Sequence, residues 1–168
     1  MRSFPPVSTR DARVLVLGSM PGRASLAAVQ YYAHPRNAFW PIMGELCEFG
    51  ADAAYRVRLA ALRRSRIALW DVLQSCVRPG SLDSDIAPES AEPNDFPAFF
   101  ARHRRIRAVL CNGGTAHDLF RRRVLPALGE PFGSLPVHRL PSTSPAHAGM
   151  DAATKLARWR AELAPLLR

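Results

Sequence analysis

The sequence predicts an α/β domain with a parallel sheet, and three observations support this prediction. Short runs of consecutive apolar residues are typical of parallel strands that are covered on both faces. Amphipathic stretches with apolar residues at three-to-four spacing separate these runs and predict helices. The length of 168 residues fits one domain with a substantial core. Strands that alternate with helices then indicate βαβ units with right-handed crossovers.

The predicted strands are spread along the chain at residues 14–17, 67–70, 108–111 and 137–140. None of them alternates strictly between apolar and polar residues, as a strand with one solvent-facing side would. The predicted helices are 38–46, 53–64, 95–103, 115–124 and 151–163. We expect a single domain over residues 1–168, in which residues 1–12 form a loosely ordered N-terminal segment.

The segment 77–94 interrupts this pattern, because it is rich in proline, serine and acidic residues. It follows the end of the second predicted strand, which makes it a loop at the carboxyl edge of the sheet. Loops longer than about 12–15 residues in a compact domain are usually functional or disordered. Ser81, Asp83 and Ser84 are therefore candidate site residues.

The chain is strongly basic, with 23 lysine and arginine residues against 14 acidic residues and a formal net charge of +9. Such a balance favours a polyanionic partner, most often nucleic acid. The basic runs 102–107 and 121–123 are candidate DNA contacts, although solvated helix faces explain them equally well.

Cysteine usage and hydropathy exclude several other classes. Cys47, Cys76 and Cys111 are widely spaced and belong to no Cys-x-x-Cys or Cys/His pattern, so no structural zinc or iron–sulfur site is predicted. An odd number of thiols fits a reducing cytoplasm. No segment is apolar enough for a targeting signal or a membrane span.

Small or polar residues follow each predicted strand, and ligands of open parallel sheets bind beyond the carboxyl ends of the strands. The first such segment is the turn Gly-Ser-Met-Pro-Gly at 18–22, which is neither a dinucleotide-binding motif nor a phosphate-binding loop nor a nucleophile elbow. Glycine permits close backbone approach and proline stiffens the turn. Gly18, Ser19 and Met20 are therefore candidates for a pocket wall, with an ordinary strand-to-helix turn as the alternative.

The segment 31–40, YYAHPRNAFW, combines aromatic rings with an amide and an imidazole. Rings can stack on a flat base while an amide pairs with its polar edge. A functional role is favoured for Tyr32 and Asn37, because a buried asparagine must be hydrogen-bonded. Phe39 is a further candidate for the pocket, with an anchor in the core as the alternative, and Trp40 is expected to be such an anchor.

Two more segments complete the candidate site. Asn112 follows the third strand and either caps the next helix or faces a ligand; Thr115 is available as the cap, which favours the ligand. Ser142, Thr143 and Ser144 lie between two prolines, in a stiff loop whose hydroxyl and amide groups suit phosphate oxygens. Helix capping is the alternative there. His147 is a phosphate ligand, a general acid or a solvated surface residue.

Together these motifs resemble the uracil-DNA glycosylase superfamily, and within it the hypoxanthine-DNA (deoxyinosine) glycosylase branch, often called family 6. The resemblance covers most of the chain and rests on LGSMPG, YYAHPRNAFW, ALWDVLQSC with GSLDSDI, CNG and LPSTSPAHA. It implies a three-layer α/β/α sandwich with a central four-stranded parallel sheet. It also implies hydrolysis of a base–sugar bond without metal or cofactor. The expected partner is DNA that contains deaminated bases, and the expected protein is a cytoplasmic, nucleoid-associated monomer of a bacterial type.

The resemblance also implies roles for individual residues. The turn at 18–22 forms the wall near the scissile bond, Tyr32 stacks on the flipped base and Asn112 reads the base edge. The loop with Ser142, Thr143, Ser144 and His147 contacts phosphate and supports a residue that probes the duplex.

Met20 is a departure from the classical pattern, in which an Asp or Asn at this place positions the attacking water. Asn37, in the HPxN segment, is the matching residue of the family-6 pattern and takes that role. The alternatives are a mismatch-specific uracil/thymine glycosylase, against which Met20 argues, and a non-catalytic nucleic-acid-binding module. A small-molecule hydrolase using His147 or Asp71 is a weaker alternative, because the sequence contains no recognisable nucleophile–base pair.

Overall fold

A four-stranded parallel sheet lies at the centre of the computed structural model, which describes residues 1–167. Its strands are β1 (Val14–Gly18), β2 (Ile67–Asp71), β5 (Ala108–Asn112) and β6 (Val137–Leu140), in the order β2-β1-β5-β6. The register places Gly18 opposite Asp71 and Asn112 opposite Leu140, so the strands end along one edge. The α/β class and the parallel sheet predicted from the sequence are confirmed.

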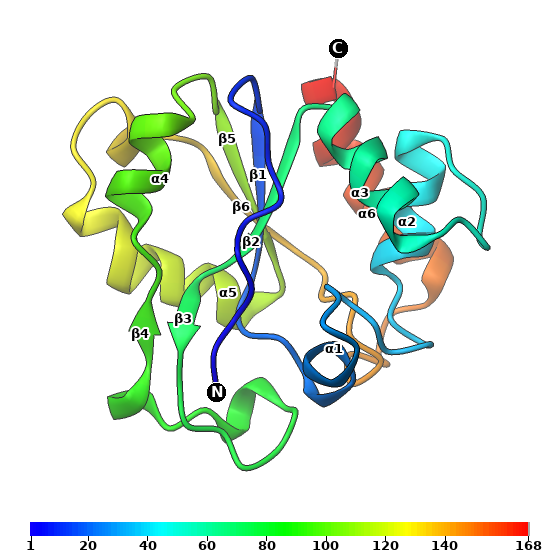
Figure 1. The fold of residues 1–168 in the computed structure, drawn as a ribbon, viewed down its shortest axis with the longest axis horizontal. Coiled ribbons are helices and arrows are strands. Elements are labelled where there is room, and N and C mark those ends of the chain that lie inside the picture. The colour runs from blue at the N-terminus through cyan, green and yellow to red at the C-terminus, as the bar shows by residue number, and fades with distance from the viewer. Residues whose placement is uncertain (168) are drawn as a thin grey trace.

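Helices cover both faces of this sheet, which gives the three-layer sandwich (Figure 1). The helices α2 (Phe39–Cys47), α3 (Tyr55–Arg64) and α6 (Ala152–Leu163) lie on one side, and α4 (Phe96–Arg102) and α5 (Gly114–Leu119) lie on the other. Alternate residues of β1 face the two sides of the sheet. Val14 and Val16 join the apolar cluster on the side of α2, α3 and α6, and Leu15 and Leu17 join the cluster on the side of α4 and α5. Burial on both faces explains the uninterrupted apolar runs in the sequence.

The structure contains several short elements that the sequence did not predict. The helix α1 (Arg23–Ala28) has six residues, too few to show helical periodicity, and α5 continues as one π-helical turn over Phe120–Val124. Two short strands, β3 (Leu73–Ser75) and β4 (Glu92–Pro93), lie at the two ends of the predicted loop and pair antiparallel. Short 3-10 turns at Asp83–Asp85 and Pro88–Ser90 shape the segment between them.

The N-terminal segment 1–12, expected to be loosely ordered, is hydrogen-bonded along the sheet edge. Val7 exchanges two backbone hydrogen bonds with Leu69 at 2.8–2.9 Å, and the Trp70 indole donates to the carbonyl of Phe4 at 3.1 Å. Ala12 is fully buried. β2 is an edge strand whose outer backbone groups need partners, and the segment supplies them. No helix among residues 1–167 is both long and apolar enough to cross a membrane.

Candidate active site

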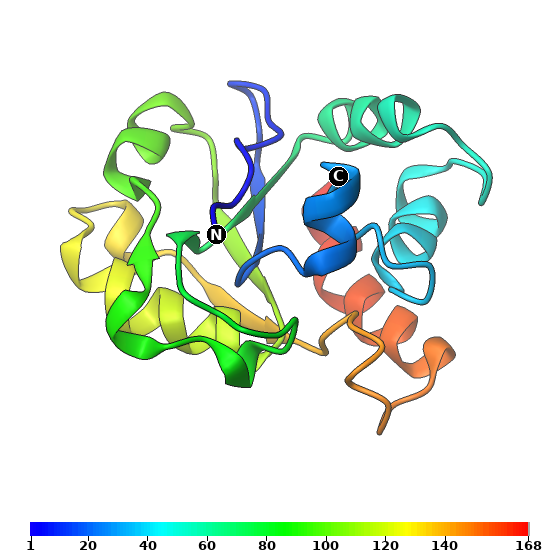
Figure 2. The same cartoon turned by 60° about the horizontal axis from the view of Figure 1, so that its bottom comes forward.

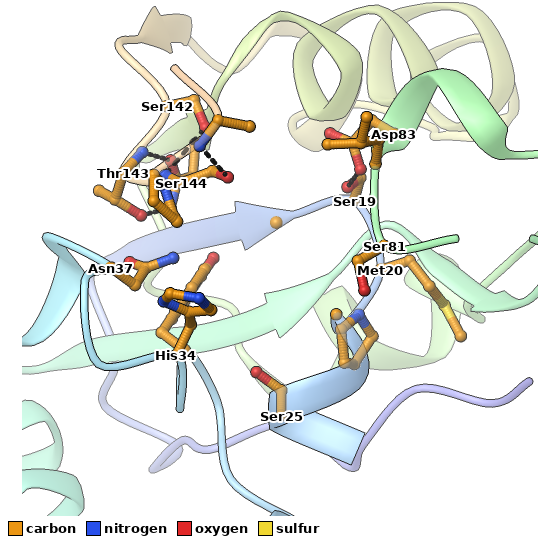
Figure 3. Close-up of a pocket in the computed structure, with 18 of the residues that line it drawn as sticks. Ser19, Met20, Ser25, His34, Asn37, Ser81, Asp83, Ser142, Thr143 and Ser144 are labelled. Carbon is orange, nitrogen blue, oxygen red and sulfur yellow. Dashed lines mark hydrogen bonds between the residues drawn. The ribbon is translucent and has the colours of Figure 1, made fainter. Parts of the chain in front are cut away.

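A pocket of about 500 Å³ opens at the carboxyl edge of the sheet. Figure 2 shows α1, the green segment after β3 and the orange segment after β6 gathered around this edge. In Figure 3, Ser19, Met20 and Asp83 lie on one side of the pocket and Asn37 and Ser144 on the other. The pocket is lined by nearly all residues singled out from the sequence: Gly18, Ser19, Met20, Tyr32, Asn37, Ser81, Asp83, Ser84, Asn112, Ser142, Thr143, Ser144 and His147.

Gly18 ends β1 at the floor of this pocket, where two polar groups approach it closely. A Cβ atom at this position would lie 2.6 Å from Asp71 Oδ1 and 2.7 Å from the Tyr32 hydroxyl, closer than real side-chain contacts allow. The glycine is therefore required by close packing rather than by a turn. Met20, two residues on, is buried among the apolar residues on the α4–α5 side of the sheet.

Tyr32 and Phe39 form a stacked pair, with ring centroids 4.2 Å apart and an interplanar angle of 29°. Tyr32 has a left-handed backbone (φ 53°) and presents its ring to the pocket. Phe39 is fully buried behind it and does not line the pocket, which favours the core-anchor alternative over a contact with the base. Phe39 supports the ring that faces the pocket.

Asn37 lies just before α2, and its side chain contacts both the start of that helix and the pocket. Its Oδ1 accepts a hydrogen bond from the Phe39 backbone N–H at 2.9 Å, which satisfies one of the free donors at the helix start. Its amide projects into the pocket (Figure 3) and retains two N–H groups and one lone pair. His34 lies beside it, and its Nδ1 accepts from the Arg36 N–H at 3.1 Å, so the ring proton is assigned to Nε2.

Asn112 and Thr143 are joined by two hydrogen bonds of 2.9 Å. The Asn112 Nδ2 donates to Thr143 Oγ1, and the Thr143 N–H donates to Asn112 Oδ1. Thr143 is 1% exposed and its hydroxyl oxygen accepts from Asn112, which favours a role in holding the loop over a phosphate contact. Asn112 keeps one N–H and one lone pair for a base, while its main bonds fasten the loop to β5.

The rest of the loop after β6 stays accessible at the pocket rim. Ser142 and Ser144 are partly buried and His147 is exposed. Two buried side chains of α6 hold the loop from beneath: the Trp159 indole donates to the Pro141 carbonyl at 3.0 Å, and Lys155 Nζ donates to the Ser144 carbonyl at 3.4 Å. Lys155 and Trp159 were missed in the sequence because they lie on the helix that follows the motif, where a lysine and a tryptophan are not distinctive.

The loop after β3 closes the other side of the pocket and is tied to the first turn. Ser19 donates to Asp83 Oδ1 at 2.5 Å, and the Arg23 N–H donates to Ser81 Oγ at 3.1 Å. The buried guanidinium of Arg78 donates to the Pro21 carbonyl and lies 3.9 Å from Asp83. The sequence indicated this loop through Ser81, Asp83 and Ser84, but not its buried arginine.

Asp71 ends β2 on the pocket floor and is 3% exposed. Its Oδ2 and the Tyr32 hydroxyl have no hydrogen-bond partner among residues 1–167. Burial raises the pKa of Asp71 to about 7; the charge of Asp83 acts in the same direction and that of Arg78 opposes it. Burial also raises the pKa of the Tyr32 hydroxyl, and the charge of Asp71 raises it further. The nearby Asn112 amide lowers this pKa, although it makes no hydrogen bond to the hydroxyl.

The basic run 102–107 lies before β5, at the amino edge of the sheet and therefore on the side away from the pocket. Arg102, Arg104 and Arg105 line a separate hollow there together with Arg10. Arg23 lines the pocket itself, and Arg36 is exposed beside it. Within the described part of the chain, no group of three or more His, Cys, Asp or Glu side chains could hold a metal ion.

A family model for the uracil DNA glycosylase superfamily matches residues 5–167. The chain belongs to this superfamily. Two proteins named hypoxanthine DNA glycosylase are similar to it: one from Methanosarcina barkeri, 39% identical over 67% of this chain and 70% of that protein, and one from Methanosarcina acetivorans, 39% identical over 70% and 73%. A solution NMR structure of an M. acetivorans protein, provisionally described as a uracil DNA glycosylase, is also similar, with a TM-score of 0.81 and 31% identity over 99% of this chain and 98% of the other.

Membership of the uracil DNA glycosylase superfamily confirms the family expected from the sequence. The pocket lies at the carboxyl edge of the sheet, where open α/β sheets generally bind their ligands.

Proposed function

We propose that this protein is a monofunctional DNA glycosylase that hydrolyses the N-glycosidic bond of deoxyinosine, with deoxyuridine as a second substrate. The observation that supports this most directly is the meeting of Tyr32, Asn37 and Asn112 in one pocket. A stacking ring, an amide for water and an amide for the base edge are what removal of a flipped base requires. The names of the two Methanosarcina relatives favour hypoxanthine as the base.

The proposed mechanism begins with extrusion of the damaged nucleotide into the pocket. Extrusion costs a few kcal/mol and is easiest at mismatched pairs, which inosine and uracil form. The flipped base stacks on Tyr32, whose ring is held by Phe39 behind it. The backbone turn at 18–22 forms the wall, and Met20 adds an apolar surface without acid–base capacity.

Asn37 is proposed to position the attacking water. Its free N–H groups can donate to the water oxygen, and the second lone pair of Oδ1 can accept one of the water protons. Cleavage passes through an oxocarbenium-like state with a departing base anion, so a neutral amide suffices and no strong base is needed. Because Oδ1 also bonds the start of α2, the amide is fixed in place before substrate arrives.

The loop after β6 is proposed to hold the DNA backbone. Ser142, Ser144 and the backbone amides near them offer hydrogen bonds to phosphate oxygens, and the exposed His147 lies where the duplex would meet the rim. We propose further that the protein acts as a monomer in the cytoplasm and reaches the nucleoid through DNA binding; gel filtration with and without a duplex tests the monomer.

Single-turnover cleavage of labelled duplexes tests the proposal. Each duplex contains one inosine, uracil or xanthine, and alkali reveals the abasic site. We expect cleavage at inosine and an Asn37→Ala variant that is slower by about 100-fold or more while it binds DNA normally. Asn37→Asp keeps an acceptor for the Phe39 N–H and controls for damage to the helix start. Cleavage of none of these duplexes by the wild type would refute the proposed activity, and full activity of Asn37→Ala would remove Asn37 from the mechanism.

A further inference from the structure

The carboxyl group of Asp71 is buried on the pocket floor and is not fully hydrogen-bonded. It lies on the pocket floor, Oδ2 has no hydrogen-bond partner among residues 1–167, and the adjacent hydroxyl of Tyr32 has none either. The other carboxyl oxygen, Asp71 Oδ1, and the Tyr32 hydroxyl flank the same glycine, at 2.6 and 2.7 Å from the position of a Cβ atom on Gly18. Buried polar groups of this kind are costly unless a ligand satisfies them.

The Asn112 amide can satisfy one of the two hydrogen-bonding groups on the edge of a deaminated base, its carbonyl. Two of its hydrogen-bonding positions are committed to Thr143, and one N–H remains. That N–H can donate to a base carbonyl. The ring N–H next to such a carbonyl needs an acceptor, and an ionised carboxylate is the strongest acceptor that the pocket floor offers.

We propose that ionised Asp71 accepts the ring N–H of the flipped base and thereby distinguishes deaminated bases from adenine and cytosine. This inference rests on the proposed glycosylase function and names the residue that selects its substrate. Deamination replaces an exocyclic amine by a carbonyl and places a proton on the neighbouring ring nitrogen, N1 of hypoxanthine or N3 of uracil. Adenine and cytosine present a lone pair at this nitrogen, and Asp71 repels it.

Guanine defines the limit of this selection, because it also carries a proton on N1. Its exclusion therefore depends on other properties, namely its extra amine at C2 and the stability of its pair with cytosine. Asp71 is expected to separate inosine from adenine and uracil from cytosine, and not hypoxanthine from guanine.

The charged and titratable groups around Asp71 determine how its selection depends on pH. Asp83, from the turn Asp83–Asp85, raises its pKa, and Arg78, from the loop after β3, lowers it; Tyr31 and Tyr32 face it from the segment after α1. Burial is the largest effect, and the pKa is raised to about 7. The acceptor form therefore increases as pH rises through neutrality, and kcat/KM on inosine should rise with it.

The test compares pH profiles of four proteins on duplexes with inosine or with adenine in an A·C mispair. In Asp71→Asn, the rise through neutrality disappears, inosine cleavage at pH 8 falls by about 10- to 100-fold, and the preference for inosine over adenine narrows. In Asp83→Asn, the rise moves to lower pH, because a charge that raises the pKa of Asp71 is removed. Asp52→Asn, an exposed acid on the loop before α3, is the matched control and keeps the wild-type profile.

Two results would overturn the inference. A wild-type rate that falls as pH rises through neutrality would make Asp71 a proton donor, and a profile unchanged in Asp71→Asn would make it a structural group.

Calorimetric binding of free hypoxanthine and free adenine supplies a second measurement that needs neither turnover nor the variant. The wild type must bind hypoxanthine more tightly at pH 8 than at pH 6, and its affinity for adenine must not rise in the same way. This measurement also separates the two proposals, because a protein that cleaves no duplex refutes the glycosylase activity whether or not the base binds in this way.

Discussion

Substitution of Asp71 by asparagine should make the protein more stable in neutral and alkaline solution. The carboxyl has an ordinary pKa of 3.8, and burial raises it to about 7 in the folded protein. A shift of about 3 pK units at 1.36 kcal/mol each corresponds to ~4 kcal/mol of differential stability. The folded state holds the proton more tightly than the unfolded chain does. The cost of ionising Asp71 is therefore absent below about pH 4, grows between pH 4 and 7, and is complete above pH 7.

Urea unfolding of the wild type and of Asp71→Asn at pH 5 and pH 8 measures this effect. The variant should gain up to ~4 kcal/mol at pH 8, which for a domain of this size corresponds to a rise in Tm on the order of 10 °C, and much less at pH 5. Asp52→Asn, whose carboxyl is exposed, should match the wild type at both pH values. If Asp71→Asn is no more stable than the wild type at pH 8, the carboxylate has partners within the fold, and the reasoning from its unpaired state fails.

Three further predictions follow from the site geometry. Gly18→Ala should abolish cleavage and lower Tm, because its Cβ would meet Asp71 and the Tyr32 hydroxyl; a soluble variant with normal kinetics would contradict this close packing. Tyr32→Ala should weaken binding of substrate duplexes by about 10- to 100-fold, whereas Tyr32→Phe keeps the stacking ring; equal losses in both would assign the effect to the hydroxyl. Arg23→Ala should flatten the salt dependence of duplex binding, and Arg102→Ala, on the far edge, should not.

Local patterns in the sequence determined the elements and the set of motifs. Apolar runs of four residues identified β1, β2, β5 and β6, because strands buried on both faces must be apolar throughout. The edge rule for parallel sheets then placed the turn at 18–22, Asn112 and the loop after β6 around one pocket. Three-to-four periodicity located α2 to α6, but not the six-residue α1.

The tertiary structure alone decided how neighbouring candidates divide their roles. Tyr32 and Phe39 are both aromatic, and only their packing shows that one faces the pocket and the other stands behind it. Thr143 belongs to a run of hydroxyls, yet two bonds to Asn112 withdraw it from the surface. The Asn112–Thr143 contact joins residues 31 positions apart. No local period in the sequence encodes such a contact, or the way in which the Tyr32 and Phe39 rings pack.

Asp71 is the clearest example of a residue whose properties only the tertiary structure decides. In the sequence it is a polar residue at the end of an apolar strand, and its type indicates neither its protonation nor its partner. Its raised pKa arises because β1, β2, the segment after α1 and the loop after β3 together exclude water from one carboxyl group. The sequence by itself therefore determined the family, the sheet and the edge at which the site lies. Burial and electrostatics, which are sums over the whole fold, decided which groups on that edge are free to meet a base.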